Sequence, residues 1–332
     1  MTQEAPVESR IADQERAVVI VRGGALGDHV LTLPAIAALR RAYPNAPLGW
    51  IGHPSRGRLA RPDFLADADG RVGTALYREG PDMLPEWLLG AQRVVVYAPD
   101  PRQLVARLRP VCDGHVTGWD PRPPSSGSLH VTAHLAAAMN APMPAEQSVP
   151  PAKAGMPPET NTLTPRFCPT DSERDNARQQ WADLGIAPTR VVLLHAGSGG
   201  DAKCWPPEGF LAIGQALEEA GWTIALLSGP VEAERSHRYT DLARRWPSIG
   251  ADDPVELAAL LAPVRCLIGN DSGPGHLAAA VGVSTLSLFG PTDPHVWCPR
   301  GPDSHVVQSP TGHMVDLSVG AVGDASLSVL QV

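Results

Sequence analysis

The sequence predicts an α/β protein built from two doubly wound domains. Short apolar runs alternate with stretches of helical length through both halves of the chain, as in parallel sheets covered by helices. A proline-rich segment at 142–169 separates the halves, and 332 residues are more than a typical single core holds. We therefore expect a frayed tail at 1–16, a first domain at 17–165 whose proline-rich linker begins at 142, and a second domain at 166–332.

The first half opens with a buried strand followed by a helix. Residues 17–22 read Ala-Val-Val-Ile-Val-Arg, a run typical of a strand covered on both faces of a sheet. Glycines follow, and then a helical stretch from Val30 to Tyr43 that Pro44 ends. Further strands are expected at 48–51 and 94–97, and further helices at 102–109 and 129–139.

The second half repeats this alternation. A helix at 172–184 precedes a buried strand at 191–195. The other expected elements are helices at 207–220, 233–245, 255–261 and 275–281 and strands at 223–228, 265–269 and 284–289. The stretch after Met314 gives no firm signal for a final helix. Ligands bind at the carboxyl ends of strands in such sheets, so the loops from strands into helices are the expected ligand sites.

Composition and charge exclude several classes of protein. Hydrophobic residues make up 43% and charged residues 19% of the chain, an ordinary balance for a globular protein. The net charge of -8 argues against nucleic acid as a partner, because phosphate contacts need clustered Lys and Arg. No apolar run approaches the roughly 20 residues of a membrane-spanning helix, and residues 1–16 lack the apolar core of a signal peptide. These features predict a cytoplasmic protein.

The cysteines and histidines give no sign of a metal site. The five cysteines are widely spaced, odd in number and form no CxxC pair, which favours reduced thiols over disulfides or zinc. Histidines such as His115, His130 and His237 lack the spacing of metal ligands. We expect no metal and no cofactor.

The loop Gly23-Gly24-Ala25-Leu26-Gly27-Asp28-His29 lies between the first strand and its helix. Its glycines let the backbone approach a ligand, but their spacing is not that of the dinucleotide-binding GxGxxG motif. Asp28 stands near the start of the helix, where it could cap the helix or serve in catalysis. The spacing leaves these two interpretations equally open.

Two loops of the second half suit an anionic ligand. The loop at 195–206 follows an apolar strand and combines glycines with Ser198 and Lys203, which could reach an anion. The loop at 270–276 again leaves a strand for a helix and offers Ser272 and free N–H groups at the positive end of the helix dipole. Together the two loops predict a diphosphate site.

Three sequence blocks carry a family resemblance. They are Arg22-Gly23-Gly24-Ala25-Leu26-Gly27-Asp28 with Leu31-Thr32-Leu33-Pro34-Ala35, then Lys203-Cys204-Trp205-Pro206, and Asn270-Asp271-Ser272-Gly273 with His276-Leu277-Ala278-Ala279-Ala280 and Phe289-Gly290-Pro291-Thr292. In their order and separation the chain resembles the ADP-heptose:lipopolysaccharide heptosyltransferases, glycosyltransferase family 9, over nearly its whole length.

The resemblance implies a GT-B fold, in which two Rossmann-like domains face each other across a cleft. It also implies an inverting, metal-independent transfer of a sugar, with Asp28 as the general base. By the same resemblance the donor ribose is held by Glu232, and the donor diphosphate is held by Ser198, Lys203, Asp271, Ser272, Gly273 and His276.

The acceptor is expected in the first domain. Arg56, Arg58 and Arg61 form a basic cluster that could meet phosphates or acidic sugars, although a solvated basic turn explains the cluster equally well. Arg22 borders the same region. The resemblance implies a nucleotide-sugar donor, most directly ADP-heptose, and a lipid-linked oligosaccharide acceptor such as the lipopolysaccharide core. It also implies peripheral contact with the inner face of the cytoplasmic membrane.

Two other functions remain open at this point. A sugar-nucleotide epimerase or hydrolase of GT-B fold would use the same kind of donor without an acceptor. A non-catalytic sugar-nucleotide-binding protein would bind the donor and transfer nothing.

Overall fold

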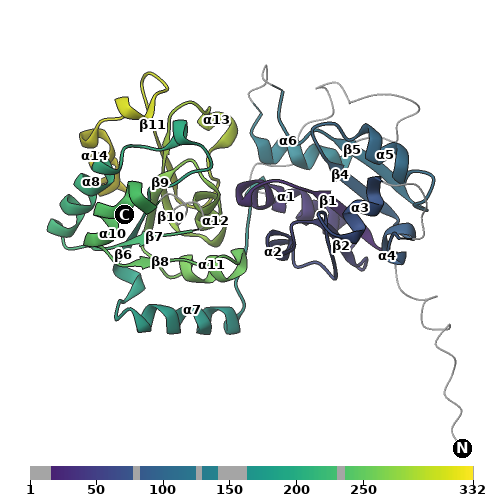
Figure 1. The fold of residues 1–332 in the computed structure, drawn as a ribbon, viewed down its shortest axis with the longest axis horizontal. Helices are drawn as coiled ribbons and strands as arrows, with labels where there is room; N and C mark the ends of the chain where they lie inside the picture. The colour runs from purple at the N-terminus through teal and green to yellow at the C-terminus, as the bar shows by residue number, and fades with distance from the viewer. Residues whose placement is uncertain (1–15, 78–82, 125–128, 141–162, 230–235, 332) are drawn as a thin grey trace, which may run out of the picture. The chain divides into compact units, whose positions relative to one another are not determined.

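The computed structural model describes residues 16–77, 83–124, 129–140, 163–229 and 236–331 (Figure 1). The chain divides into two compact units. The first unit comprises Met1–Gly23, Ala35–Arg122 and His134–Pro157, and the second comprises Gly24–Pro34, Pro123–Ala133 and Pro158–Val332, as far as each range is described. The loop that carries Asp28 therefore packs with the second unit, and the segment from 142 that was predicted as a linker lies largely outside the described residues.

The first part of the chain alternates strands and helices as the sequence predicts. The elements are β1 (Val18–Arg22), α1 (Leu26–Ala42), β2 (Leu48–Gly52), α2 (Pro54–Gly57), η2 (Arg58–Ala60), β3 (Phe64–Asp67), α3 (Arg71–Tyr77), α4 (Glu86–Leu89), β4 (Arg93–Tyr97), α5 (Arg102–Leu108), β5 (His115–Trp119), α6 (Val131–Ala137) and η3 (Ala138–Asn140).

The sheet of the first unit is parallel, with strand order β3-β2-β1-β4-β5. The apolar strand β1 lies at its centre, where Val18 pairs with Leu48 of β2 and Arg93 of β4. All five residues of β1 are buried, because both faces of a central strand are covered. The order reverses beside β1, which is the place where open parallel sheets bind ligands.

The second part of the chain forms a larger sheet. Its elements are α7 (Asp171–Asp183), η5 (Pro188–Arg190), β6 (Val191–His195), η6 (Asp201–Lys203), α8 (Pro207–Glu219), β7 (Thr223–Leu227), η7 (Ser236–Tyr239), α10 (Thr240–Arg245), β8 (Ser248–Ile249), α11 (Pro254–Leu261), β9 (Cys266–Asn270), α12 (Gly273–Val281), β10 (Ser284–Phe289), α13 (Pro294–Trp297), β11 (Ser304–Gln308), η8 (Met314–Asp316) and α14 (Val319–Leu330).

This six-stranded sheet is also parallel, in the order β11-β10-β9-β6-β7-β8. Helices α7, α11 and α12 pack together, and α8 packs with α10 and α14 (Figure 1). The apolar face of α8 buries Phe210, Ile213 and Leu217 in a core that also holds Trp205 and Trp246. This core fixes the carboxyl ends of β6, β9 and β10, from which the candidate loops leave.

The C-terminal helix α14 is an element that the sequence did not reveal. Ser318 caps it, accepting a hydrogen bond from the amide of Ala321 at 3.2 Å. Two glycines lower its intrinsic helix propensity, but its buried face, which includes Val322 and Val329, packs against α8. Tertiary packing therefore stabilises a helix that the local sequence does not favour.

Candidate active site

A buried carboxylate organises the loops of the second unit. Asp271 follows β9, and its side chain is only 6% exposed. Its Oδ2 accepts a hydrogen bond from Lys203 Nζ at 2.7 Å and another from Thr292 Oγ1 at 2.8 Å. Charge-assisted bonds of this kind are strong where water is excluded. They hold the ammonium group of Lys203, itself 35% exposed, in one place at the carboxyl edge of the sheet.

Backbone bonds join the same loops. Ser198 Oγ donates to the backbone oxygen of Asp271 at 2.7 Å, so this predicted phosphate ligand serves as a tie between two loops. Asn270 Nδ2 donates to the backbone oxygen of Ala196 at 2.7 Å, and Asn270 Oδ1 accepts from the amide of Trp205 at 3.0 Å. The loops after β6 and β9 are therefore tied together at Ala196, Ser198 and Trp205.

The start of α12 presents polar atoms that have no protein partner. Ser272 precedes the helix, and its Oγ is buried without a hydrogen bond, as is Nδ1 of His276. His276 is 5% exposed, and its Nε2 lies 3.9 Å from Asp271 Oδ1. Buried polar atoms are normally satisfied, so such atoms beside a helix N-terminus mark a place where a ligand can bind.

Burial is the largest cause that lowers the pKa of His276. Asp271 opposes this effect, Lys203 adds to it, and Asp28 opposes it more weakly. The imidazole is therefore neutral near pH 7 and can donate or accept a hydrogen bond there without adding positive charge. The positive charge of this site comes from Lys203 and the helix dipole.

Asp28 occupies the third position of α1, because this helix begins at Leu26 and not at Val30. Its Oδ2 accepts a hydrogen bond from the amide of Ala25 at 2.8 Å, so the capping interpretation is realised. Gly24 is required for this geometry: its φ is 111°, and a Cβ there would lie 2.6 Å from Asp28 Oδ2. The cap fixes the direction of the carboxylate, and a carboxylate has the capacity for several hydrogen bonds.

Close glycine packing joins the starts of α1 and α12 within the second unit. A Cβ on Gly273 would lie 2.8 Å from the Cβ of Leu26 and 3.0 Å from the amide nitrogen of Gly27. A Cβ on Gly27 would lie 3.1 Å from Cδ2 of His276. Asp28 therefore sits beside the loop that carries Ser272 and His276, and the predicted base and the predicted diphosphate loop meet.

The predicted acceptor residues of the first unit are in different environments. Arg22 is only 4% exposed, and its guanidinium lies 5.8 Å from the centre of the Tyr97 ring. Tyr97 donates to the backbone oxygen of Leu135 at 2.7 Å, and burial raises the pKa of its phenol. Arg22 thus lies within the packed carboxyl end of the sheet and not on an exposed basic surface.

The basic cluster at 56–61 lies on α2 and η2. Arg58 and Arg61 are exposed, and Arg56 is half-buried. Arg61 has φ 49° and ψ 54°, and among the described residues it is the one non-glycine residue with positive φ. Arg40 supports this conformation, since its Nη2 donates to the backbone oxygens of Ala60 at 3.2 Å and Arg61 at 2.7 Å. A left-handed arginine is a strained residue of the kind found at binding sites.

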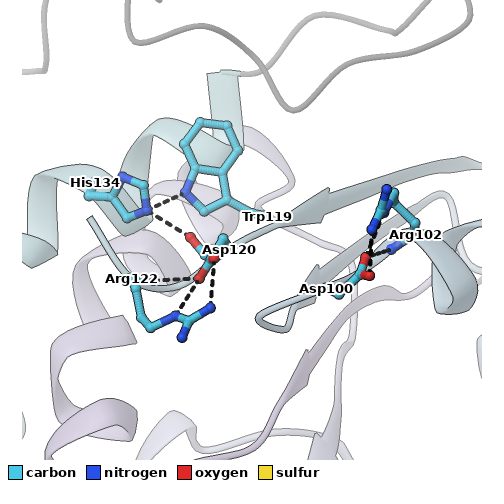
Figure 2. Close-up of polar contacts among 6 residues, drawn as sticks. All are labelled: Asp100, Arg102, Trp119, Asp120, Arg122 and His134. Carbon is cyan, nitrogen blue, oxygen red and sulfur yellow. Dashed lines mark hydrogen bonds and ion pairs between the residues drawn. The ribbon is translucent and has the colours of Figure 1, made fainter. Parts of the chain in front are cut away.

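Two features at the carboxyl ends of the strands have no role in the predictions from sequence. One is Thr292, which belongs to a family block but has no predicted role. The other is the tripeptide Asp-Pro-Arg, which occurs at 100–102 and again at 120–122, after the neighbouring strands β4 and β5 (Figure 2). The repetition of the tripeptide is a signal that was visible in the sequence.

In both turns the arginine folds back onto its own aspartate. Arg102 donates from Nε and Nη2 to the two oxygens of Asp100, each at 2.8 Å. Arg122 donates in the same way to Asp120, at 3.2 and 3.1 Å. Trp119, beside the second turn, donates from Nε1 to Nε2 of His134 at 3.1 Å (Figure 2). In the first unit, two arginines after β4 and β5 are therefore each paired with the aspartate two residues before them.

Glu232, the predicted ribose ligand, lies outside the described residues. Within the described ranges, no group of three or more His, Cys, Asp or Glu side chains is arranged to hold a metal ion. The same residues contain no helix with the length and apolar character needed to span a membrane.

Comparisons with known proteins place the chain among its relatives. Residues 158–322 match the family model described as glycosyltransferase family 9 (heptosyltransferase). The chain is similar to lipopolysaccharide heptosyltransferase 1 of Pseudomonas aeruginosa, with 36% identity over 118 residues, which cover 35% of this chain and 33% of that protein. The matched stretch thus spans about a third of the curated relative's length.

Solved structures share the fold over nearly the whole chain. A glycosyl transferase of family 9 from Veillonella parvula has a TM-score of 0.73 at 18% identity, covering 96% of this chain and 98% of its own. A heptosyltransferase of Escherichia coli with ADP has a TM-score of 0.67 at 18% identity, covering 94% of this chain and 99% of its own. These likenesses confirm the predicted fold class, the two Rossmann-like α/β units of the GT-B fold.

Proposed function

The chain belongs to glycosyltransferase family 9, and we propose that it transfers a heptose from ADP-heptose to the lipopolysaccharide core or a related lipid-linked oligosaccharide. The transfer inverts the anomeric centre and needs no metal ion. The observation that carries this proposal is the hydrogen bonding of Lys203 and Thr292 to the buried Asp271 carboxylate, beside the unpartnered polar atoms at the start of α12.

The network around Asp271 must stabilise the negative charge of the leaving group. The acceptor hydroxyl oxygen attacks the anomeric carbon, and the bond from that carbon to the diphosphate oxygen breaks. The nucleoside diphosphate leaves with the electron pair, so negative charge grows on its phosphates. Lys203 and the N–H groups at the start of α12 stabilise that charge without having to reorient. Ser272 and His276 complete the diphosphate site with their unpartnered atoms.

Asp271 and Ser198 act on the donor through other groups. A carboxylate repels a phosphate, so Asp271 contributes by fixing Lys203, to which it is bonded at 2.7 Å. Ser198 contributes by tying its glycine loop to the backbone of Asp271. Gly273 lets the diphosphate approach the helix N-terminus and leaves room for the Asp28 loop. Glu232 holds the donor ribose in this proposal.

Asp28 receives the proton of the acceptor hydroxyl as the oxygen attacks. General-base catalysis of this kind contributes about 10²–10⁴ to the rate. The support for this role is its position beside His276 and Gly273 and its fixed orientation through the cap to Ala25. Arg56, Arg58 and Arg61 serve the anionic acceptor, Arg22 supports the acceptor side from within the packed end of the sheet, and the enzyme works as a peripheral protein at the cytoplasmic face of the membrane.

A product analysis tests the proposal. Purified protein is incubated with ADP-heptose, with and without a lipopolysaccharide core that lacks heptose. We expect ADP and heptosylated core only when both substrates are present, an inverted anomeric configuration by NMR, and an unchanged rate in EDTA. ADP release without acceptor would instead indicate a hydrolase, rearranged donor an epimerase, and bound but unchanged donor a non-catalytic binding protein.

A further inference from the structure

The glycine loop at 197–203 is anchored at its two ends. Ser198 Oγ binds the backbone oxygen of Asp271 at 2.7 Å, and Lys203 Nζ binds its carboxylate, also at 2.7 Å. Between these anchors, Gly199 and Gly200 have no atom within 4 Å of the place where a Cβ would lie. Within the loop, the amide of Lys203 donates to the backbone oxygen of Gly200 at 3.0 Å in the short turn η6. Glycines in open space have wide conformational freedom, so this turn needs a further restraint to keep one position.

An ion pair restrains the middle of the loop. Asp201 Oδ1 accepts a hydrogen bond from Arg238 Nη1 at 2.9 Å, and the side chains are 67% and 33% exposed, respectively. Arg238 lies on η7, next to Tyr239, which is 7% exposed and belongs to the same core as Trp205. The arginine is therefore next to a residue of the core, whereas the aspartate belongs to the glycine loop, two residues before Lys203.

We propose that the Arg238–Asp201 ion pair is a clasp that holds the glycine loop in its ligand-binding conformation and so sets the affinity for the nucleotide donor. Both are positioning residues that act through Lys203 and the loop backbone. The inference rests on the proposed function, because it takes Lys203 and this loop as the donor diphosphate site.

The physical basis is preorganisation. A loop that is free before binding loses conformational entropy when the ligand orders it, and this loss weakens binding. A restraint present in the unliganded protein removes part of that loss. Because the pair is largely exposed, water and salt screen it, and we expect an effect of about fivefold on donor affinity. The turnover number should not change, since neither residue acts on the reacting atoms.

A double-mutant cycle tests the clasp, with ADP as the probe. Calorimetry measures the Kd of ADP for the wild type, Arg238→Gln, Asp201→Asn and the double variant. We expect each single change to raise Kd about fivefold, and the double variant to be no weaker than either single one. In the transfer assay the donor KM should rise equally, while kcat and the acceptor KM stay unchanged.

The matched control is the ion pair of Arg245 with Glu218, which joins α10 and α8 at 2.7 Å in the same unit. Arg245→Gln should leave the Kd of ADP unchanged. Unchanged or tighter ADP binding by Asp201→Asn overturns the clasp, as does a double variant whose loss is the product of the single losses. Wild-type protein that binds ADP without transferring sugar contradicts the proposed function but leaves the clasp measurable. Protein that does not bind ADP contradicts both.

Discussion

In the second unit, Lys203 and Asp271 meet from loops 68 residues apart, whereas in the first unit Arg102 and Asp100 meet within a single turn. Asp271 is 6% exposed, while Asp100 and Arg102 are 59% and 83% exposed. The Arg102–Asp100 pair forms between residues close in sequence and lies in water, where an ion pair contributes little to stability. The Lys203–Asp271 pair exists only once the fold is complete, and its carboxylate is protected from water.

The buried Asp271 carboxylate and its cation suit the donor diphosphate that this edge is proposed to bind. The donor diphosphate is the same in every turnover, and a fixed cation in a dry site stabilises its charge most strongly. The buried network should therefore respond strongly to substitution, and the exposed turns weakly.

The largest expected effect is on the buried pair. Lys203→Met leaves the Asp271 carboxylate in its buried position without a cation. We expect the free energy of unfolding to fall by about 2–3 kcal/mol and donor binding to be lost, because an unpaired buried charge is strongly unfavourable. Chemical denaturation and ADP calorimetry measure the two effects.

Two control variants sharpen this prediction. Adding Asp271→Asn to Lys203→Met removes the unpaired charge, so most of the stability should return while donor binding stays absent. Asp100→Asn, at the exposed pair, should not measurably move the denaturation midpoint. If Asp100→Asn and Lys203→Met destabilised the protein equally, the contrast between the two edges would be wrong.

The glycine contact between α1 and α12 should give the next largest effect. Gly273→Ala places a Cβ 2.8 Å from the Cβ of Leu26, so the start of one helix must move. We expect a loss of about 1–3 kcal/mol in stability and a fall in kcat of about 10²-fold, as expected for displaced catalytic groups. The control is Gly323→Ala in α14, where a Cβ meets nothing within 4 Å and a gain of about 0.5–1 kcal/mol is expected. Equal kcat values for the two variants would contradict the packing argument.

A buried histidine should make stability depend on pH. His130 Nε2 donates to the backbone oxygen of Cys298 at 2.9 Å, and burial lowers the pKa of His130 to about 4. Below its ordinary pKa of about 6.5 the unfolded chain takes up a proton that the folded protein does not. Stability from this group is therefore present above pH 6.5 and decreases as pH falls towards 4, by about 3 kcal/mol.

The measurement is chemical denaturation of the wild type and His130→Gln at several pH values between 4 and 7. The glutamine variant should lose part of this slope. The matched control is His295→Gln: His295 is exposed on α13, and its replacement should leave the slope nearly unchanged. A slope that is the same in the His130 variant would show that His130 does not cause it.

The smallest expected effect concerns strain in the basic cluster. Arg61→Gly relieves a left-handed conformation at a non-glycine residue, so we expect stability to rise by about 1 kcal/mol. If Arg61 contacts the acceptor, the acceptor KM should rise several-fold in the same variant. A thermal melt and acceptor kinetics check both. Loss of stability would contradict the strain at Arg61, and an unchanged acceptor KM would remove Arg61 from the binding site.

The sequence predicted the strands that are long apolar runs and missed those that are not. Residues 18–22, 191–195 and 266–270 are buried throughout and stand out in the sequence. Strand β5 reads His-Val-Thr-Gly-Trp, and β8 has two residues, so neither shows a clear apolar run. Such strands form because neighbouring strands pair with them, which is a tertiary effect that no local pattern records.

The contacts within the candidate site could not be predicted from local sequence either. The order of the motifs predicted that Lys203, Asp271 and His276 belong to one diphosphate site, but their contacts depend on the fold. The bond from Thr292 to Asp271 and the use of Ser198 as a loop tie join residues 21 and 73 positions apart. Local spacing did suggest that Asp28 could cap its helix, and the structure contains that cap.

The most direct test of the proposed catalytic role is the turnover of Asp28→Asn with ADP-heptose and a heptose-free core. An asparagine oxygen can still accept the hydrogen bond from Ala25, so the loop keeps its cap while the base is removed. We predict that the Kd of ADP stays within about twofold of the wild type while kcat falls by about 10²–10⁴. A kcat close to that of the wild type would show that Asp28 is a helix cap and not the base.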